Sequence, residues 1–345
     1  MKKVENKEKL RFAIIGTGNI SSEHISAVQN LDGAEVAYIY GRNESVLKEL
    51  SKEYNLSWTT DYQSILDNSE IDVVDIVLPS GLHVEFGIKA AQAGKHVIVE
   101  KPIDVTLEKA EELIISCKEA GVTLGVISQM RFSDGMQEIY EYVTAGKLGK
   151  IIQGDAYIKW YRSMEYYDSG EWRGTYALDG GGAFINQAIH FIDLLLSIMG
   201  PVKSVSAKTR TVNHNIEVED IGMVMVEFVN GAHGIIQAST AIFPGLPARL
   251  EIHGSNGTVI FENDKIVFQH IKGDEQFSAV KDEEISGAAD PKNLNSDLFI
   301  RQFEDIISAI KQKREPKVSG EEAYKALELI IAIYESSNSG EPVEL

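Results

Sequence analysis

The sequence predicts an α/β protein with two domains, and three observations support this prediction. The chain has 345 residues, and domains hold roughly 100–200 residues each. Its first third alternates short apolar runs with segments of helical periodicity, which predicts a parallel sheet with right-handed crossovers. The remainder carries strand-like runs separated by glycine and asparagine turns, which predicts an α+β domain with a mostly antiparallel sheet. We place the domains at residues 1–123 and 124–345.

In the first domain, apolar runs and helical patterns follow one another in regular order. We expect strands over residues 10–15, 35–40, 73–78, 96–99 and 123–127. We expect helices over residues 20–31, 45–54, 61–66, 84–93 and 107–120. Proline ends two of the strands, because it fixes φ and lacks an N–H donor, and glycine closes the last two helices.

The second domain mixes helices with alternating runs. Helices are expected over residues 136–145 and 184–199, the latter after the triplet Gly180-Gly181-Gly182. Strands are expected over residues 150–161, 202–210, 223–229, 234–240, 248–253 and 259–262. Two amphipathic helices, 296–311 and 321–336, close the chain, and we expect these C-terminal helices to pack back near the first domain.

Composition and charge exclude several classes of function. The formal net charge is -19, from 33 basic and 52 acidic residues, so the chain repels nucleic acid and anionic membranes. We therefore expect neither a nucleic-acid nor a membrane partner. Cys117 is the single cysteine of the sequence, which excludes an intrachain disulfide and predicts a reducing, cytoplasmic setting.

The clearest chemical motif is the segment Gly16-Thr17-Gly18-Asn19-Ile20-Ser21, which follows the first strand and opens the first helix. In this setting the first glycine permits a tight turn, and the second lets the backbone approach a pyrophosphate. The helix N-terminus adds unpaired N–H groups and the positive end of its dipole. Serine stands where a third glycine is usual, and it is small enough to pack near the strand. The segment predicts a dinucleotide-binding domain.

The end of the second strand bears on which dinucleotide binds. An NAD site usually places Asp or Glu there to bind the ribose 2′-hydroxyl, whereas this chain has Tyr40-Gly41-Arg42-Asn43. A guanidinium binds phosphate in a bidentate way, so Arg42 favours NADP over NAD. In the alternative interpretation, Arg42 is a solvated loop residue and Asn43 caps the next helix.

A second motif, Glu100-Lys101-Pro102, follows the strand at residues 96–99. Ligands of doubly wound sheets bind at the carboxyl ends of the strands, so we expect this lysine beside the nicotinamide. Proline fixes the backbone there and ends the strand. A lysine after a strand is often only a surface residue, but the flanking acid and proline favour a functional one.

Together these segments resemble the Gfo/Idh/MocA oxidoreductase family, named for glucose–fructose oxidoreductase and inositol dehydrogenase. The residues that carry the resemblance are the glycine turn, Pro79 with His83, Gly94-Lys95-His96-Val97 running into Glu100-Lys101-Pro102, Trp172-Arg173-Gly174, and the stretch from Gly180 to Asp193. The match covers nearly the whole chain in order. It implies a Rossmann domain followed by a domain with a large open-faced sheet. Family members often use that sheet for oligomer contacts, so we expect a homodimer or a homotetramer.

The resemblance also implies hydride transfer between a nicotinamide and a carbon of a sugar, polyol or sugar derivative. By motif position, Lys101 is the catalytic lysine and His190 the catalytic histidine. Family members commonly carry aspartate four residues before that histidine, where this chain has Asn186. Residues four apart share a helix face, so Asn186 and His190 should face one cleft. An amide cannot stabilise an imidazolium by charge, so the substitution favours Lys101 over a simple aspartate–histidine relay.

The identity of the proton acceptor stays open at this point. The pKa of histidine suits a general base near neutral pH, and a lysine can serve if burial and nearby positive charge lower its pKa. In the alternative interpretation, His190 is only a core residue of an apolar helix. Relatives acting on nucleotide-linked sugars carry a similar asparagine–glutamine variant, so nucleotide sugars join the possible substrates.

The remaining candidate site residues follow from the same motifs. Candidate cofactor-binding residues are Gly16, Thr17, Gly18, Asn19, Ile20, Gly41, Arg42, Leu78, Pro79, Ser80, His83, Glu100, Lys101, Trp172 and Arg173. Candidate substrate-binding residues are Arg131, Tyr161, Asn186 and His190. Asp193 is interpreted either as a structural acceptor or as a catalytic group. The acidic residues and histidine of segment 214–220 lack tight ligand spacing, so we expect no metal site.

The sequence therefore predicts an NAD(P)-dependent dehydrogenase or reductase that acts on CH–OH groups of a small, sugar-like substrate. Two alternatives remain. One is a lyase or glycosidase-like enzyme that keeps its nicotinamide bound and oxidises the substrate only transiently to cleave a bond. The other is a non-catalytic cofactor-binding protein.

Overall fold

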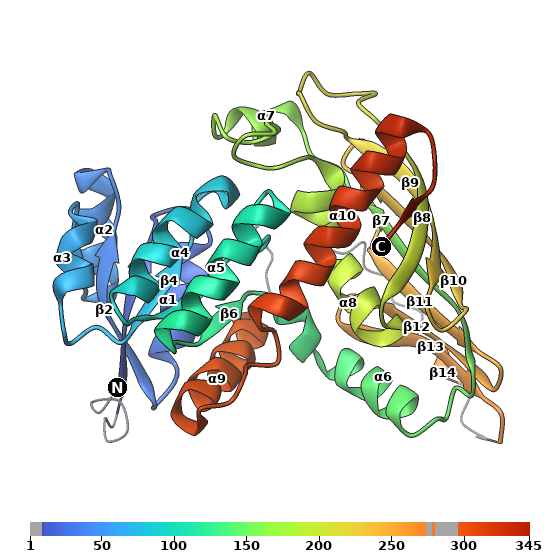
Figure 1. Ribbon diagram of the computed structural model, residues 1–345, viewed down its shortest axis with the longest axis horizontal. Coiled ribbons are helices and arrows are strands. Elements are labelled where there is room, and N and C mark those ends of the chain that lie inside the picture. The colour runs from blue at the N-terminus through green and yellow to red at the C-terminus, as the bar shows by residue number, and fades with distance from the viewer. Residues whose placement is uncertain (1–8, 274–277, 280–295) are drawn as a thin grey trace. The chain divides into compact units, whose positions relative to one another are not determined.

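The computed structural model describes residues 9–273, 278–279 and 296–345 (Figure 1). The chain divides into two compact units. The first comprises Met1–Gln129 and Asn295–Tyr324, and the second comprises Met130–Leu294 and Lys325–Leu345. The first unit therefore contains a C-terminal segment as well as the N-terminal residues, and the domain boundary expected after residue 123 stays a prediction.

The first unit is built on a parallel sheet of six strands: β1 (Leu10–Ile15), β2 (Ala34–Tyr40), β3 (Ser57–Thr59), β4 (Val73–Ile76), β5 (His96–Val99) and β6 (Leu124–Val126). Their order is β3-β2-β1-β4-β5-β6, and all neighbouring pairs are parallel. This is the order of a Rossmann sheet, in which the direction of strand addition reverses between β1 and β4. The predicted fold class is confirmed. Sequence analysis missed β3, whose 3 residues are too few to show a period of two.

Helices connect these strands: α1 (Ser21–Gln29), α2 (Glu44–Tyr54), α3 (Tyr62–Asp67), α4 (His83–Gln92) and α5 (Leu107–Ala120), with a short 3-10 helix at Ser80–Leu82. The side chains of Asn43, Asp61 and Thr106 accept backbone N–H groups at the starts of α2, α3 and α5. Such caps satisfy donors that lack an intrahelical partner. Helix α5 ends at Gly121, whose φ of 65° is left-handed, as is usual for a glycine that ends a helix.

Helix α9 (Ser296–Gln312) belongs to the first unit and completes its core. Phe299 and Phe303 are buried, and the ring of Phe303 meets that of Phe12 on β1 edge-on, with centroids 6.2 Å apart. Aromatic pairs of this geometry add to the free energy of burial. Helix α10 (Gly320–Ser339) begins in the first unit and continues in the second.

The second unit is built on a mostly antiparallel sheet of nine strands. They are β7 (Ile151–Lys159), β8 (Val202–Arg210), β9 (Ile221–Phe228), β10 (His233–Ser239), β11 (Arg249–Gly254), β12 (Gly257–Glu262), β13 (Lys265–Ile271), β14 (Ser278–Ala279) and β15 (Val343–Glu344). Their order is β14-β13-β12-β11-β7-β10-β9-β8-β15, and only β7 and β10 pair in parallel. Helices α6 (Asp134–Thr144) and α8 (Ile189–Met199) pack against this sheet, and α7 (Met164–Asp168) follows β7 (Figure 1). The predicted α+β architecture is confirmed.

The continuous helix predicted over residues 184–199 is wrong at its start. Residues Ala183–Ala188 form a π-helix, and the regular helix α8 begins only after it. The backbone at Gly182 lies so close to its surroundings that a Cβ there would collide with the carbonyl oxygen of Glu219. The carboxylate of Glu219 also accepts the N–H groups of Gly182 and Phe184, each at 2.9 Å. These long-range contacts hold the start of the segment out of regular helical geometry.

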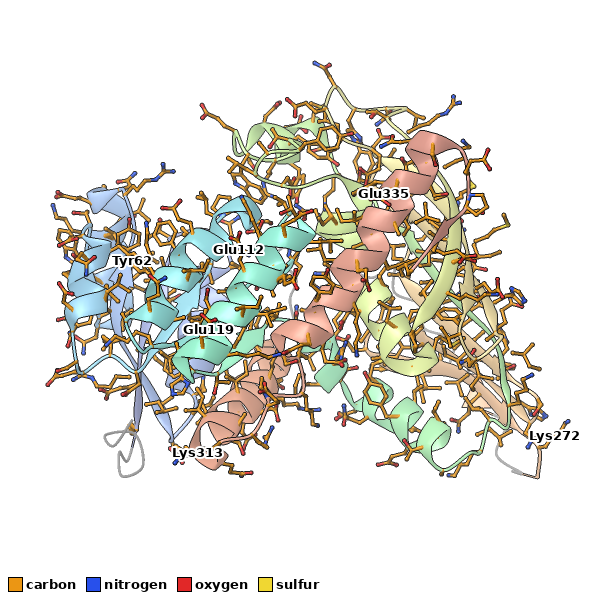
Figure 2. All side chains as sticks on the ribbon, in the orientation of Figure 1. Tyr62, Glu112, Glu119, Lys272, Lys313 and Glu335 are labelled. Atoms are coloured by element: carbon orange, nitrogen blue, oxygen red, sulfur yellow. The ribbon has the colours of Figure 1, made fainter. Side chains whose placement is uncertain are left out.

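Acidic side chains lie on exposed helix faces of both units. Glu112 and Glu119 project from α5, and Glu335 projects from α10 (Figure 2). Exposed carboxylates keep their hydration, so the surface accommodates these negative charges without a desolvation cost. Among the residues that the structure describes, none of the helices has the length and apolarity of a membrane span.

Candidate cofactor and catalytic site

The turn after β1 combines close packing on one side with open space on the other. Gly16 has a φ of 128°, and a Cβ there would lie 2.5 Å from the carbonyl oxygen of Val77. Glycine alone tolerates both conditions. At Gly18, by contrast, a Cβ would meet no heavy atom within 4 Å. The open side at the N-terminus of α1 fits a pyrophosphate held by backbone N–H groups.

Ser21 accounts for the missing third glycine of the motif. Its side chain is fully buried, and its hydroxyl donates to the carbonyl oxygen of Gly18 at 2.6 Å. The backbone N–H of Ser21 donates to the same oxygen at 3.0 Å. Serine therefore adds a hydrogen bond that closes the turn, and it remains small enough for α1 to pack against the sheet.

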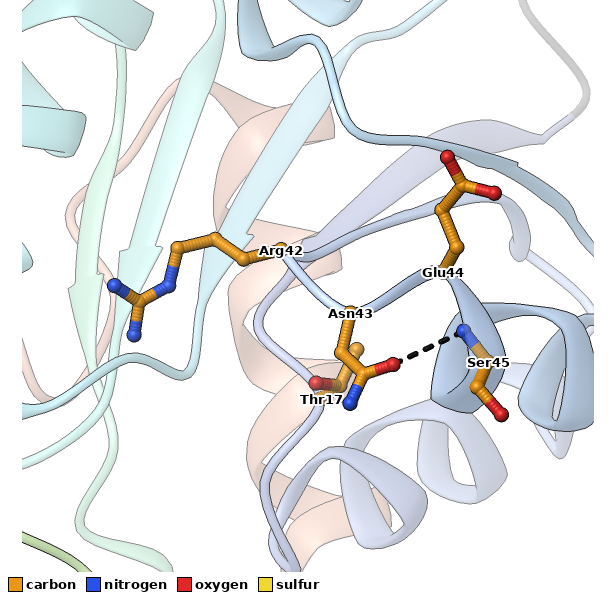
Figure 3. A pocket seen from close by; sticks show the side chains of 5 residues that line it. All are labelled: Thr17, Arg42, Asn43, Glu44 and Ser45. Carbon is orange, nitrogen blue, oxygen red and sulfur yellow. Dashed lines mark hydrogen bonds between the residues drawn. The ribbon is translucent and has the colours of Figure 1, made fainter.

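The ends of β1 and β2 border a depression of about 670 Å³ that is lined by Thr17, Arg42, Asn43, Glu44 and Ser45 (Figure 3). Gly41 lies beside it, since a Cβ there would come within 2.7 Å of Cγ2 of Thr17. Oδ1 of Asn43 accepts the N–H of Ser45 at 3.0 Å, so this side chain caps α2. The exposed Arg42 side chain points away from Glu44 and has no hydrogen-bond or ion-pair partner among the described residues (Figure 3). The depression thus offers an unengaged guanidinium next to the glycine turn.

His83 connects the segments that follow β4 and β5. Its ring is buried, with Nδ1 lying 2.8 Å from the carbonyl oxygen of Pro102 and Nε2 lying 2.9 Å from that of Leu78. The other predicted residues of this region, Pro79 and Ser80, are half-buried and buried, respectively. Both ring nitrogens of His83 thus contact main-chain carbonyl oxygens, so the ring joins the segment after β4 to the segment after β5.

Lys101 lies two residues after the end of β5 and is half-buried. Its backbone N–H donates to Oε2 of Glu100 at 2.9 Å, and its peptide bond to Pro102 is cis. The other carboxylate oxygen of Glu100 lies 3.0 Å from Nε2 of His24. Nδ1 of the same ring lies 2.8 Å from Oδ2 of Asp75 on β4. A chain of buried polar groups therefore links α1 and β4 to the backbone at Lys101.

Sequence analysis missed His24 and Asp75, although an aspartate inside an otherwise apolar strand was a signal. Burial lowers the pKa of His24, but attraction to Asp75 and hydrogen bonds to Asp75 and Glu100 outweigh burial and raise it to about 10. Burial also raises the pKa of Asp75, against the opposing effect of His24. Three coupled groups of this kind titrate together, and this cluster retains a proton at neutral pH.

In the second unit, Asn186 lies in the π-helix and has a fixed orientation. Its Nδ2 donates to Oδ1 of Asp179, and its Oδ1 accepts from Nε2 of Gln187 at 2.8 Å. Asp179 is buried, and its other oxygen accepts the N–H of Gly174 at 2.8 Å. Asp179 was not predicted, because it lies in a loop without periodicity. This chain lacks the aspartate that family members commonly carry at this position, and the carboxylate of Asp179, from a neighbouring segment, contacts the Asn186 amide instead.

His190 lies in the first turn of α8 and is half-buried. The expectation that Asn186 and His190 share one face rested on a regular α-helix. A π-helix has a wider turn than an α-helix, so the spacing of four residues does not by itself align the two side chains. Their common orientation stays a prediction.

Two arginines flank one tyrosine near the π-helix. The guanidinium carbons of Arg162 and Arg173 lie 5.5 and 4.3 Å from the centroid of the Tyr166 ring. Arg173 also stacks on Trp172 at 4.4 Å and donates to the Tyr166 hydroxyl at 2.6 Å. The buried Arg162 donates to Oε1 of Gln187 at 2.9 Å. The predicted residues Trp172 and Arg173 thus belong to an aromatic and cationic cluster that borders the π-helix.

The predicted substrate residue Arg131 is buried and forms a bidentate ion pair with Asp193. The two N–O distances are 2.7 and 2.6 Å. Buried charges of this kind are tolerated when they are paired, so Asp193 is a structural acceptor for Arg131. The predicted residue Tyr161 is half-buried, and its ring meets Phe243 edge-on at 5.3 Å.

Two groups of potential metal ligands lie among the described residues of the second unit. Nδ1 of His214 lies 2.9 Å from Oδ2 of Asp220, so two of the candidate ligands in segment 214–220 contact each other. Within the described ranges, Asp155, Glu251 and His253 place one ligand atom each within 4.8 Å of one another. Asp155 and Glu251 already accept donors of the protein. These contacts explain the group as a polar network of the sheet.

The sequence matches two family profiles that together span most of the chain. Residues 10–128 match the oxidoreductase family's NAD-binding Rossmann fold, and residues 141–345 match its C-terminal alpha/beta domain. The chain belongs to the Gfo/Idh/MocA oxidoreductase family. The match agrees with the Rossmann strand order of the first unit and with the mostly antiparallel sheet and the helices of the second.

Several relatives are similar over nearly their whole length. The scyllo-inositol 2-dehydrogenase (NAD(+)) of Bacillus subtilis is 27% identical over 349 residues, which cover 98% of this chain and 97% of that protein. The D-glucoside 3-dehydrogenase of Escherichia coli is 28% identical over 370 residues, with 100% of both chains covered. The WlbA dehydrogenase of Bordetella pertussis, solved with NADH and UDP-GlcNAcA, is 32% identical with a TM-score of 0.86, covering 98% of this chain and 99% of that one. By its family, this chain is an oxidoreductase with an NAD-binding Rossmann domain.

Replacing Gly18 with alanine tests the open side of the glycine turn. We expect the affinity for NADH, measured by fluorescence titration, to fall about tenfold or more, because the methyl group occupies the space next to the pyrophosphate. Thermal unfolding without cofactor should change by less than about 2 °C, because the methyl group meets no protein atom. Gly16→Ala is the matched control, and it should destabilise the protein without cofactor. Unchanged NADH affinity in Gly18→Ala would contradict this placement of the pyrophosphate.

Proposed function

We propose that this chain transfers a hydride between the nicotinamide of NAD(P) and a carbon of a sugar, polyol or sugar derivative. The observation that carries the proposal is the placement of two motifs in one parallel sheet. The Gly18 turn follows β1, and Lys101 follows β5. Both motifs therefore lie at the carboxyl edge of the sheet, where dinucleotides bind in Rossmann domains.

The residues of the first unit fit the cofactor in three places. We propose that the turn Gly16-Thr17-Gly18-Asn19-Ile20 holds the pyrophosphate and that Gly41 and Arg42 border the adenosine ribose. The segments Leu78–His83 and Glu100–Lys101 would then face the nicotinamide, with Trp172 and Arg173 as further candidate contacts. The open side of Gly18 supports this fit, because a ligand can approach the backbone there without displacing a side chain. When bound, the nicotinamide accepts or supplies the hydride.

We propose Lys101 and His190 as catalytic residues, from their motif positions. Oxidation of an alcohol needs a group that accepts the hydroxyl proton while the hydride leaves the carbon. The imidazole of His190 is suited to accept that proton near neutral pH. Lys101 can accept it when deprotonated, or it can stabilise the developing alkoxide as a fixed cation. Asn186, whose amide is oriented by its neighbours, would hydrogen-bond the substrate.

Nucleotide-linked sugars belong to the proposed substrate class. The WlbA relative was solved with UDP-GlcNAcA, and its identity to this chain exceeds that of the inositol and glucoside relatives. An anionic substrate needs positive charge near its phosphate or carboxylate groups. Arg162 and Arg173, which both face Tyr166, support such a substrate. Arg131 and Tyr161 remain further candidates for substrate contact.

Replacing Lys101 with methionine should lower turnover about a thousandfold or more, because the methionine side chain keeps the length of the stem but removes the proton acceptor and the charge. NADH affinity should stay within about threefold of wild type, since the pyrophosphate contacts are unchanged. The measurement is reduced-nicotinamide absorbance with a panel of sugars, polyols and nucleotide sugars. Lys89→Met, at an exposed position on α4, is the control and should behave as wild type. Surviving turnover in Lys101→Met would refute the role of Lys101. If the wild type cleaves a substrate without net formation of reduced cofactor, the bond-cleaving alternative is favoured.

We propose that NADP is preferred over NAD. The support is the exposed Arg42 next to the glycine turn, together with the lack of an acid in residues 40–43 at the end of β2. Glu44 also lines the depression, but it begins α2 and its side chain points away from that of Arg42 (Figure 3). Arg42→Ala should lower kcat/KM for NADP by about 10- to 100-fold, because a charge-assisted contact to the 2′-phosphate is lost. The value for NAD should change by less than about threefold. Steady-state kinetics with both cofactors gives the ratio, and tighter NAD than NADP binding by the wild type would reject the preference.

We propose a homodimer or homotetramer formed through the open face of the second sheet. Met223 and Met225 on β9 are 55% and 66% exposed, and Ile235, which pairs with Met225 across β10, is 41% exposed. Exposed apolar side chains gathered on one face mark an interaction surface. Met225→Lys should therefore shift the mass measured by sedimentation toward the monomer, whereas Val212→Lys, at a loop residue that is 60% exposed, should not. A wild-type monomer at micromolar concentration would disprove the proposal.

We also expect the protein to work in the cytoplasm. Its single cysteine, Cys117, lies on the inner face of α5 and is buried. Burial raises the pKa of the Cys117 thiol to about 12, so the thiol stays protonated and unreactive. A chain with one inert thiol suits a reducing compartment.

A further inference from the structure

The buried cluster of His24, Asp75 and Glu100 has no part in hydride transfer as described so far. We propose that His24 is a positioning residue for Lys101: its ring holds Glu100 against α1 and β4, and Glu100 in turn fixes the backbone at Lys101. The inference rests on the proposed catalytic role of Lys101. It assigns a function to the helix that follows the glycine turn, beyond its contact with the cofactor.

The geometry of the cluster makes the ring a bridge between two acids. Nδ1 of His24 lies 2.8 Å from Asp75, and Nε2 lies 3.0 Å from Glu100. Ionised carboxylates only accept hydrogen bonds, so the imidazolium form, with an N–H on each nitrogen, satisfies both contacts. The two nitrogens point in opposite directions from a rigid ring. The ring therefore fixes the separation of Asp75 on β4 from Glu100 after β5.

The surroundings of the ring keep water away from the bridge. The side chains of His24 and Asp75 are 0% exposed, and that of Glu100 is 11% exposed. From α9, the groups that face the ring are Phe299 and Phe303, whose centroids lie 5.5 and 5.3 Å from it. Hydrogen bonds between charged groups are stronger in such low-dielectric surroundings. The charged groups that face His24 are thus the two carboxylates, and they hold its orientation firmly.

The link to Lys101 runs through the second oxygen of Glu100. Oε2 accepts the backbone N–H of Lys101 at 2.9 Å, while Oε1 is held by His24. A carboxylate is planar, so fixing one oxygen also restricts the other. Loss of the ring would free Glu100 to turn and would loosen the backbone from which the Lys101 side chain extends. Catalytic rates fall steeply when a reacting group is misplaced by about 1 Å, whereas binding of the pyrophosphate at the separate glycine turn should change little.

The experiment compares three variants of the full chain at a temperature where circular dichroism shows each to be folded. His24→Leu removes both ring contacts. His24→Gln retains one N–H donor, and Asp75→Asn is the matched control. In Asp75→Asn the introduced amide can donate to Nδ1, and Nε2–H of His24 still donates to Glu100.

We expect His24→Leu to lower kcat about tenfold or more, with KM and NADH affinity within about threefold of wild type. His24→Gln should recover part of the loss, and Asp75→Asn should stay within about threefold of wild-type kcat. A purely structural role would lower thermal stability in His24→Leu but leave kcat per folded molecule unchanged. That result would overturn the proposal.

Amide hydrogen exchange at Lys101 gives a readout that does not depend on activity. The Lys101 N–H should exchange faster in His24→Leu than in wild type or Asp75→Asn, because its acceptor is no longer held. If wild type turns over no substrate of the panel, the proposed function fails, and this arm still decides whether His24 holds Lys101. If His24→Leu does not fold, His24→Gln is compared with Asp75→Asn. Equal kcat values and equal exchange rates of the Lys101 N–H in these two variants would overturn the proposal.

Discussion

The contact on which the first unit depends is the approach of the turn after β1 to the main chain after β4. The N–H of Val77 donates to the carbonyl oxygen of Ile15 at 2.9 Å, and the N–H of Gly16 donates to that of Tyr40 at 2.9 Å. The turn is therefore bonded on both sides just where the strand order reverses. A side chain at Gly16 would collide with the carbonyl oxygen of Val77, so only glycine allows the turn to lie this close to the main chain after β4. The glycine turn, the depression beside Arg42 and the segment at Lys101 all lie at the carboxyl edge of this sheet, where Rossmann folds bind their ligands.

Two buried histidines hold the loops at that edge. His83 uses both ring nitrogens to join the carbonyl oxygens of Leu78 and Pro102, and His24 uses both to join Asp75 and Glu100. Loops at strand ends are otherwise the most mobile part of a sheet. A catalytic group needs a support that is itself fixed by packing and hydrogen bonds. The imidazole rings supply this support, because each is a rigid group that contacts β4 or the segment after it on one side and the segment after β5 on the other.

Local patterns sufficed for most elements of the fold. The predicted bounds of β1, β5, α5 and β8 agree with the structure residue by residue, because their signals lie within the segments themselves. Prediction failed where a distant residue decides the outcome. The π-helix depends on Glu219, the orientation of Asn186 depends on Asp179, and the ion pair of Arg131 joins it to Asp193 across the sequence. Periodicity and spacing carry no information about such contacts. The motifs therefore predicted which residues belong to the site, but not the hydrogen bonds and ion pairs between them.

The two departures from the family motif show how neighbours can replace what a motif position lacks. At Ser21 the missing glycine is replaced by a hydroxyl that closes the turn. At Asn186 the missing carboxylate is replaced by Asp179, which bonds the amide from behind. The negative charge of Asp179 thus lies near the π-helix, but the side-chain amide of Asn186 lies between this charge and the π-helix face. A group at that face then meets a neutral, directed hydrogen-bonding partner in place of a charge. Such a partner suits the recognition of a substrate hydroxyl better than the stabilisation of an imidazolium, which is consistent with our proposal that Lys101 supplies charge for catalysis.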